Sequence, residues 1–300
     1  KTILLTGATG FLGSHLLAAL LKESYKVVII KRTASNTWRI KHLMNSVISY
    51  NVDKQSIEYI FENESINIVI HVATSYSREE QNELDVVNTN ILLGVNLLKA
   101  ATQHGTSLFI NTDTFFNVES PMSSHMRAYT LSKKQFIEWL KYFSNHGVFL
   151  VNMKIHHLYG ANDNNNKFIP WLKNNLIVNN ENIKLTSGIQ LRDFIYIDDA
   201  VRAYLFVINN EENKTKYKEY IVSTGVKTSV RDFCEELYSQ INNKYGTDSK
   251  LIFGAKLTNF NEIIDVENDC SSLNSIGWKY GTTIKQGISE MLKKEGRYID

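Results

Sequence analysis

The chain has 300 residues, of which 43% are hydrophobic and 21% charged, and its formal net charge is +2. This is ordinary globular composition, enough to bury a full core, and it excludes a strongly basic surface for nucleic acid or membrane. Two cysteines, Cys234 and Cys270, are too few for a disulfide framework or a four-ligand metal site, so we expect structural thiols in a reducing compartment. With no apolar run of ~18 residues and no signal-peptide pattern, we expect a cytoplasmic protein that binds neither nucleic acid nor membrane.

Strand and helix patterns alternate through the first half of the chain. Buried strands are predicted at four short apolar runs, residues 1–6, 27–30, 66–72 and 108–110. Helices are predicted at 16–21, 57–61 and 86–101, where apolar residues recur at helical spacing. This alternation predicts an α/β fold with a doubly wound parallel sheet of the Rossmann type.

The rhythm changes past about Lys154, where turns, short strands and asparagine-rich segments follow. We expect those segments, 162–166 and 174–182, to be surface loops. The change predicts a Rossmann domain over residues 1–160 and a smaller α+β domain over 161–300. A later stretch, about 195–225, is a candidate to pack back onto the first domain.

Three glycines, Gly7, Gly10 and Gly13, lie between the first predicted strand and the first predicted helix. They suit a tight turn, close approach of a pyrophosphate and close helix packing, while the helix N-terminus offers free N–H groups. Phe11 and Leu12 would present such amides. The context of strand and helix favours a dinucleotide site over a plain turn.

The second strand ends in Lys31 and Arg32, where NAD sites usually carry an acidic residue for the ribose hydroxyls. Two cations suit a 2′-phosphate and would be misplaced against a ribose alone. A solvated basic turn is the alternative. The pair therefore favours NADP(H) over NAD.

Tyr129 and Lys133 are four residues apart, so they share one face of a predicted helix. The ammonium favours the tyrosinate, which makes Tyr129 a usable proton donor. Tyr50 and Lys54 have the same spacing but no partner motif, and we interpret that pair as incidental. Thr112, expected just beyond the strand 108–110, could hydrogen-bond a substrate oxygen and share its proton with Tyr129.

These motifs together resemble the extended short-chain dehydrogenase/reductase family. The resemblance rests on GATGFLG, IVIHVAT, NTNILLGVNLLKAA, Thr112 with YTLSK, and LRDFIYIDDAVRAY, which occur in the family's order over most of the chain. Within the family, FINTDTFF, HMRAYTLSK, NKFIPW and FGAKLTNFNEI are most similar to the CDP-abequose and CDP-paratose synthases. Those enzymes reduce the 4-keto group of CDP-4-keto-3,6-dideoxyglucose with NADPH, for bacterial O-antigen.

The resemblance implies a role for each matching residue. Thr112, Tyr129 and Lys133 match the catalytic positions, and Arg32 with Lys31 the 2′-phosphate contact. Ala73 would line the cofactor groove beside the glycine turn. The nucleotide sugar would meet Thr112 and further candidates, which are Asp113, Thr114, His156, Lys167, Phe168 and Arg192.

The sequence departs from the family pattern at several positions. Asn51-Val52 replaces the Asp-Ile near the adenine, and Ala161 replaces a proline. An arginine often found before the C-terminal glutamate, here Glu262, is missing near Asn259. Dehydratases carry Asp-Glu after the catalytic Thr, whereas this chain has Asp113 and Thr114, so the pair for water elimination is incomplete.

Three functions remain open on these residues. The first is a ketoreductase with NADPH, the second an epimerase or dehydratase with tightly held NAD, and the third a dinucleotide-sensing binding module without catalysis. Lys31, Arg32 and Thr114 argue against the second, and an intact set of catalytic positions argues against the third.

Other candidate residues have simpler interpretations. His156 and His157 are neighbours that would point to opposite faces of a strand, so no metal site is expected. His71 is expected in the core. A homodimer through two helices is expected from the family, with candidate contacts at Leu93, Leu97, Trp139, Tyr142 and Phe143; an ordinary core face is the alternative.

Overall fold

The computed structural model describes residues 1–76, 82–117, 126–210, 216–258, 263–265 and 267–297. The chain divides into two compact units. Within the described part of the chain, the first comprises residues 1–155 and 201–222, and the second comprises 156–200 and 223–297. Asn259 and Glu262 lie outside the described residues.

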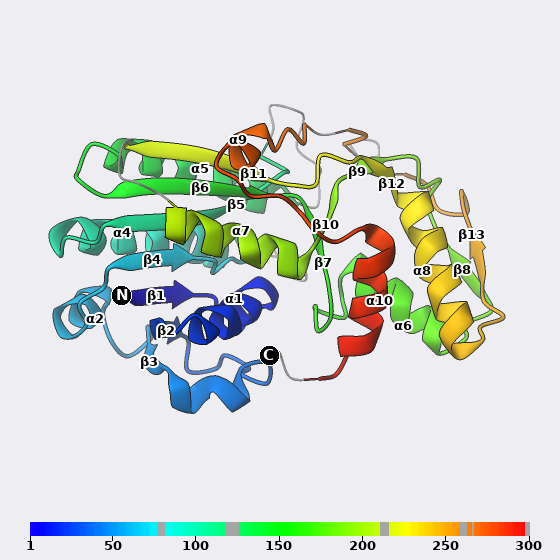
Figure 1. The fold of residues 1–300 in the computed structure, drawn as a ribbon, viewed down its shortest axis with the longest axis horizontal. Helices are drawn as coiled ribbons and strands as arrows, with labels where there is room; N and C mark the ends of the chain where they lie inside the picture. The colour runs from blue at the N-terminus through cyan, green and yellow to red at the C-terminus, as the bar shows by residue number, and fades with distance from the viewer. Residues whose placement is uncertain (77–81, 118–125, 211–215, 259–262, 266, 298–300) are drawn as a thin grey trace. The chain divides into compact units, whose positions relative to one another are not determined.

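A seven-stranded parallel sheet forms the centre of the first unit (Figure 1). Its strands, in spatial order, are β11 (Tyr217–Val222), β6 (Phe149–Ile155), β5 (Leu108–Thr114), β4 (Ile68–His71), β1 (Thr2–Thr6), β2 (Lys26–Lys31) and β3 (Ile48–Asn51). The order reverses at β1, as in a doubly wound sheet. The predicted Rossmann-type fold class is confirmed.

Helices cover both faces of this sheet because its strands are apolar on both sides. They are α1 (Phe11–Lys22), α2 (Ile57–Asn63), α3 (Glu83–Val87), α4 (Leu93–Gln103) and α5 (Arg127–Phe143), with a 3₁₀ turn at Lys41–Ser46. A π-helical turn, Asn88–Leu92, joins α3 to α4. One core cluster packs α2, α4 and α5 against the sheet, through residues such as Leu97, Phe109 and Phe136.

The second unit combines helices with short strand pairs. Its helices are α6 (Phe168–Ile177), α8 (Val230–Tyr245), α9 (Ser271–Ser275) and α10 (Ile284–Lys294). Its strands are β7 (His157–Tyr159), β8 (Asn182–Lys184), β9 (Leu191–Arg192), β10 (Phe194–Tyr196), β12 (Thr228–Ser229) and β13 (Lys250–Ile252). Helix α7 (Ile197–Asn210) contributes its residues from Val201 onward to the first unit.

The strand bounds differ from the expected ones, most of all in β5 and β4. β5 continues to Thr114 because it stays paired with β6, so Thr112 lies inside the strand and not beyond it. β4 begins at Ile68 and ends at His71. Among the described residues, no helix is long and apolar enough to cross a membrane, and no group of three or more His, Cys, Asp or Glu could hold a metal ion.

Candidate active site

The glycine turn between β1 and α1 leaves no room for a side chain at Gly7 or Gly13. Gly7 has a φ of 68°, and a Cβ there would lie 2.7 Å from the Ala73 amide nitrogen. A Cβ on Gly13 would lie 2.1 Å from the Gly7 carbonyl oxygen, so the helix packs directly on the turn. α1 begins after Gly10 with no side-chain cap and no acidic residue in its first turn. A helix N-terminus of this kind suits an anion.

Thr6 holds the neighbouring loop against this turn. Its hydroxyl oxygen accepts the amides of Val72 and Ala73 at 3.0 and 2.9 Å, and lies 2.9 Å from Nδ1 of His71. Since Thr6 has one proton to donate, it goes to Nδ1 and the neutral ring carries its proton on Nε2. Burial lowers the pKa of His71 to about 3, so this ring stays neutral and positions the loop.

The basic end of β2 is only partly free. Lys31 donates to the side chain of Asn51 at 2.8 Å. Asn51 is one of the positions where this sequence differs from the family pattern. The Arg32 side chain is 70% exposed, and its guanidinium lies 3.5 Å from an Asp85 carboxylate oxygen. Arg32 is therefore the more exposed of the two cations at this end of β2.

Tyr129 and Lys133 both point inward from α5, and both are buried. The Tyr129 ring lies against Tyr76, with centroids 4.8 Å apart. Ser132, between them in the sequence, donates to the Tyr129 carbonyl and accepts from the Asn90 side chain at 2.9 Å. Asn90 also bonds the backbone of Ser75, so the π-helical turn fixes the loop after β4 to the start of α5.

Lys133 reaches from α5 to β5. Its ammonium donates to the carbonyl oxygen of Thr112 at 2.9 Å. Burial lowers the pKa of Lys133 to about 8, and the nearby Asp113 carboxylate opposes that shift. The hydrogen bond places the lysine beside the strand that carries Thr112, as the sequence motif requires.

Asp113 lies on the α5 face of the sheet, where its carboxylate is near Lys133. Side chains alternate along β5, so Thr112 points to the other face. Asp113 is buried and accepts from the side chains of Asn152 and Asn117, each at 3.2 Å. Burial raises the pKa of its carboxyl group. Asp113 is thus enclosed by protein groups, although its position in the sequence suggested a substrate contact.

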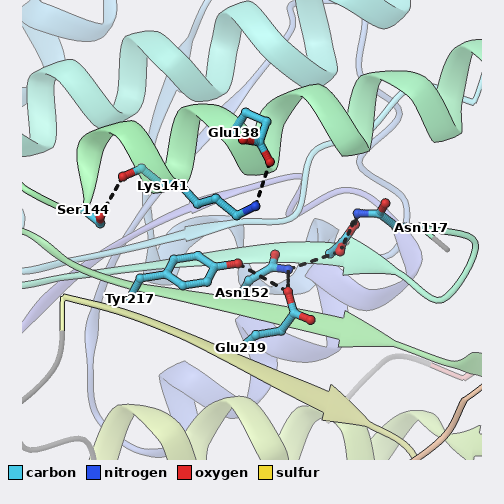
Figure 2. Close-up of polar contacts among 8 residues, drawn as sticks. Asn117, Glu138, Lys141, Ser144, Asn152, Tyr217 and Glu219 are labelled. Carbon is cyan, nitrogen blue, oxygen red and sulfur yellow. Dashed lines mark hydrogen bonds and ion pairs between the residues drawn. The ribbon is translucent and has the colours of Figure 1, made fainter. Parts of the chain in front are cut away.

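The amide of Asn152 links Asp113 to a second carboxylate. Figure 2 shows it pointing at Glu219, which it reaches at 2.9 Å. Glu219 also accepts from the hydroxyl of Tyr217 at 3.3 Å and pairs with Lys154 at 3.0 Å (Figure 2 draws the tyrosine contact). The network joins β5, β6 and β11 under α5 and holds the Asp113 carboxylate in place.

The hydroxyls of Thr112 and Thr114 lie on the opposite face from Asp113. Thr112 is half-buried, and its hydroxyl is 2.7 Å from the phenol oxygen of Tyr204 on α7. Among the described residues it bonds Tyr204 and not Tyr129. Thr114 is buried, and its hydroxyl accepts the Phe116 amide at 3.3 Å.

The remaining predicted substrate residues belong to the second unit. Arg192 is buried in β9, and its guanidinium donates to its neighbour's carbonyl oxygen at 2.7 Å. Lys167 pairs with Asp163 at 2.8 Å, and His156 is buried. Phe168 is 41% exposed and stacks on Trp171. Among the predicted substrate residues, Phe168 thus offers an exposed aromatic ring.

Asp193, next to Arg192, organises this part of the second unit. Its buried carboxylate accepts from the amide and hydroxyl of Thr224 at 2.8 and 2.9 Å and from Asn268 at 2.9 Å. Its carbonyl oxygen accepts the His157 amide. The Arg-Asp-Phe segment is therefore held at the residue that follows the arginine.

Several residues of the site were not named from the sequence. Arg39 is 7% exposed, and its guanidinium donates to the carbonyl oxygen of Thr9 in the glycine turn at 3.3 Å. Tyr76, Asn90 and Tyr204 contact Tyr129, Ser132 and Thr112, respectively. Asn90 and Tyr204 lie within the quoted motifs, but only the contacts separate them from their neighbours.

Comparison with known proteins agrees with this geometry. The profile of the NAD dependent epimerase/dehydratase family matches residues 3–223. The chain is 35% identical to a CDP-abequose synthase of Salmonella typhimurium, over 97% of each chain. It is 34% identical to a CDP-abequose synthase of Salmonella muenchen, again over 97% of each.

The fold also matches solved structures. The UDP-glucose 4-epimerase of Thermotoga maritima, solved with UDP-glucose, superposes with a TM-score of 0.83 over 98% of both chains, at 20% identity. Similarity at that level speaks for the fold alone, whereas the family profile and the Salmonella relatives cover most of the sequence. The chain belongs to the NAD dependent epimerase/dehydratase family.

Proposed function

We propose that this enzyme uses NADPH to reduce the 4-keto group of a nucleotide-linked deoxysugar, CDP-4-keto-3,6-dideoxyglucose before others, in the synthesis of bacterial surface polysaccharide. The observation that carries the proposal is that Tyr129 and Lys133 are both buried on α5 and that Lys133 donates to the Thr112 carbonyl oxygen. The name of the Salmonella relatives supports the CDP-sugar.

The residues present fit a dinucleotide. The cradle at Gly7 and Gly13 is one that a Cβ would fill, and the first amides of α1 suit a pyrophosphate. Phe11 and Leu12 would offer those amides, and Ala73 would line the groove. Arg32 would hold the 2′-phosphate. Lys31, whose ammonium is held by its hydrogen bond to Asn51, would add a second positive charge nearby.

When bound, the nicotinamide supplies the hydride that is added to C4 of the keto sugar. Tyr129 gives its phenolic proton to the sugar oxygen, and the Lys133 ammonium stabilises the tyrosinate that remains. The Thr112 hydroxyl donates to the same oxygen and polarises the carbonyl group. Each protein group thus acts on the charge that develops at one oxygen.

We assign the nucleotide sugar in part to the second unit. Arg192 is a candidate for the diphosphate, because it is buried in β9 with its guanidinium bonded to the Leu191 carbonyl oxygen, next to the firmly held Asp193. The exposed ring of Phe168, with Lys167 beside it, suits a base or sugar face. His156 remains a candidate contact.

An epimerase or dehydratase that uses NAD is the second candidate, because it shares the fold and the family. Thr114 stands where a dehydratase carries its glutamate, and its hydroxyl is already used by the Phe116 amide. This supports the reductase.

The test is NADPH oxidation with CDP-4-keto-3,6-dideoxyglucose, compared with NADH and with other nucleotide 4-keto sugars. We expect rapid consumption that is selective for NADPH and for the CDP-sugar. No consumption with any keto sugar, together with NAD retained on the purified protein, would contradict the reductase and favour the epimerase or dehydratase.

We also propose a homodimer, through the outer face of α5. Trp139 and Tyr142 are 43% and 60% exposed there and lie edge to face. Leu97, which the sequence suggested as a further contact, is fully buried in the core, and Leu93 and Phe143 pack against that core. The dimer face is thus narrower than expected, and Trp139→Glu should yield monomers in analytical ultracentrifugation.

A further inference from the structure

A buried tyrosine contacts the hydroxyl group that we assign to the substrate oxygen. Tyr204 is fully buried, and its phenol oxygen lies 2.7 Å from Oγ1 of Thr112. Burial raises the pKa of Tyr204 well above the usual range, so the phenol keeps its proton. In the described part of the chain, Thr112 is the polar partner of this phenol.

The direction of this hydrogen bond follows from burial. A buried phenol proton needs an acceptor, and Oγ1 of Thr112 is the one in reach. If Thr112 donated instead, the Tyr204 proton would be left unpaired inside the unit. Tyr204 therefore donates, and Thr112 keeps its own proton for another acceptor.

The fold holds the phenol rigidly in this place. Buried residues recur on α7 at helical spacing, at Val201, Tyr204, Val207 and Ile208, and bury that face of the helix in the first unit. Thr112 is β-branched and is paired with Met153 of β6. Neither partner can turn away without loss of packing.

We propose that Tyr204 is a positioning residue for Thr112, and that its phenol directs the Thr112 proton toward the carbonyl oxygen of the substrate. The proposal rests on the proposed ketoreductase function. Tyr204 itself touches neither substrate nor cofactor in this role. It acts by occupying one lone pair of Oγ1, which keeps the hydroxyl proton off the Tyr204 oxygen and available to the substrate.

Steady-state kinetics with the full chain test the proposal. Tyr204→Phe should lower kcat roughly tenfold, the effect of one neutral hydrogen bond, and leave the KM for NADPH unchanged. Tyr220→Phe removes a hydroxyl from another fully buried tyrosine of the same unit and should leave kcat unchanged. Tyr204→Phe in a T112V background should cost nothing further, because its effect passes through Thr112.

Equal losses from Tyr204→Phe in both backgrounds, or a wild-type kcat in the single variant, would overturn the proposal. Infrared spectra of ring-labelled tyrosine, with Tyr204→Phe to identify the band, report donation independently of turnover. We expect a donating phenol that changes in T112V, and an accepting phenol would overturn the proposal. An inactive wild-type protein would refute the proposed function, and the infrared result would then decide the direction of the bond.

Discussion

At the scale of single residues, the charge of Lys133 depends on two opposing effects. Burial disfavours its ammonium, whereas the Asp113 carboxylate favours it, and the resulting pKa is about 8. Asp113 is in turn held by Asn152, which also binds Glu219. Asp113, which the sequence suggested as a substrate contact, thus acts on the pKa of Lys133.

This balance predicts the pH dependence of the reaction. Lys133 must be protonated to stabilise the tyrosinate, so kcat/KM should fall as the pH rises through about 8. Asp113→Asn removes the effect that raises this pKa, and the alkaline limb should move to lower pH. Glu138→Gln, at an exposed position of the same helix, serves as the control. An unmoved limb in the Asp113 variant would contradict the assignment.

Tyr129→Phe should abolish turnover, by roughly a hundredfold or more, while NADPH binding stays nearly intact. The reason is that the variant keeps the ring against Tyr76 and loses only the proton donor. Rates and NADPH titrations measure the two effects. Tyr142→Phe, on the exposed face of α5, is the matched control, and a Tyr129 variant that retained most of its rate would refute the proton-donor role.

Arg32→Ala tests the choice of cofactor. Loss of a charge-assisted contact to the 2′-phosphate should weaken NADPH binding by roughly ten- to a hundredfold and leave NADH binding almost unchanged. Fluorescence titration with both cofactors measures the difference. Equal losses for the two would show that Arg32 does not contact the 2′-phosphate.

At the scale of elements, the contact between α1 and the glycine turn depends on missing side chains. A Cβ on Gly13 would lie 2.1 Å from the Gly7 carbonyl oxygen, and a backbone atom cannot move aside far enough to relieve so short a contact. At Gly10 the nearest atom is 3.2 Å away, so a methyl group fits with a small shift. Glycine is therefore needed at Gly13 for helix packing, whereas at Gly10 packing alone does not require it.

Alanine substitutions at Gly13 and Gly10 should separate the effect on helix packing from the effect on dinucleotide binding. Gly13→Ala should lower the free energy of unfolding by about 2 kcal/mol, because the helix must move off the turn. Gly10→Ala should fold almost normally and yet weaken dinucleotide binding, since its methyl group would face the pyrophosphate. Urea unfolding and cofactor titration measure the two effects. Similar unfolding midpoints for both variants would contradict the packing argument.

At the scale of the whole molecule, each unit contains a neutral histidine, fully buried at His71 and half-buried at His157. Burial lowers the pKa of His71 in the first unit and of His157 in the second to about 3. In the unfolded chain an ordinary histidine binds a proton near pH 6.5. As the pH falls, these histidines therefore bind protons in the unfolded chain before they do so in the folded protein. The free energy of unfolding decreases progressively as the pH falls from 6.5 toward 3.

Each histidine should therefore lower the free energy of unfolding by about 2 kcal/mol between pH 7 and pH 5. Urea denaturation across this range measures the slope, which gives the protons taken up on unfolding. His157→Asn should reduce that uptake by nearly one proton at pH 5. A slope that the substitution leaves unchanged would show that His157 is protonated in the folded protein.

The sequence by itself determined the fold class, the glycine turn and the order of the family motifs. Those features are local in the chain, since alternating apolar periods predict a parallel sheet and the spacing of Tyr129 and Lys133 fixes a shared helical face. The 35% identity to a CDP-abequose synthase over 97% of the chain agrees with the family that these motifs indicated.

Only the tertiary structure decided which distant side chains meet. Thr112 and Tyr204 are 92 residues apart and meet because α7 packs against the sheet. The end of β5 depended on its pairing with β6, which put Asp113 on the face opposite Thr112. Leu97 has the same apolar character as an interface residue, and only its burial placed it in the core. Such contacts depend on packing between elements far apart in sequence, which local periodicity does not encode.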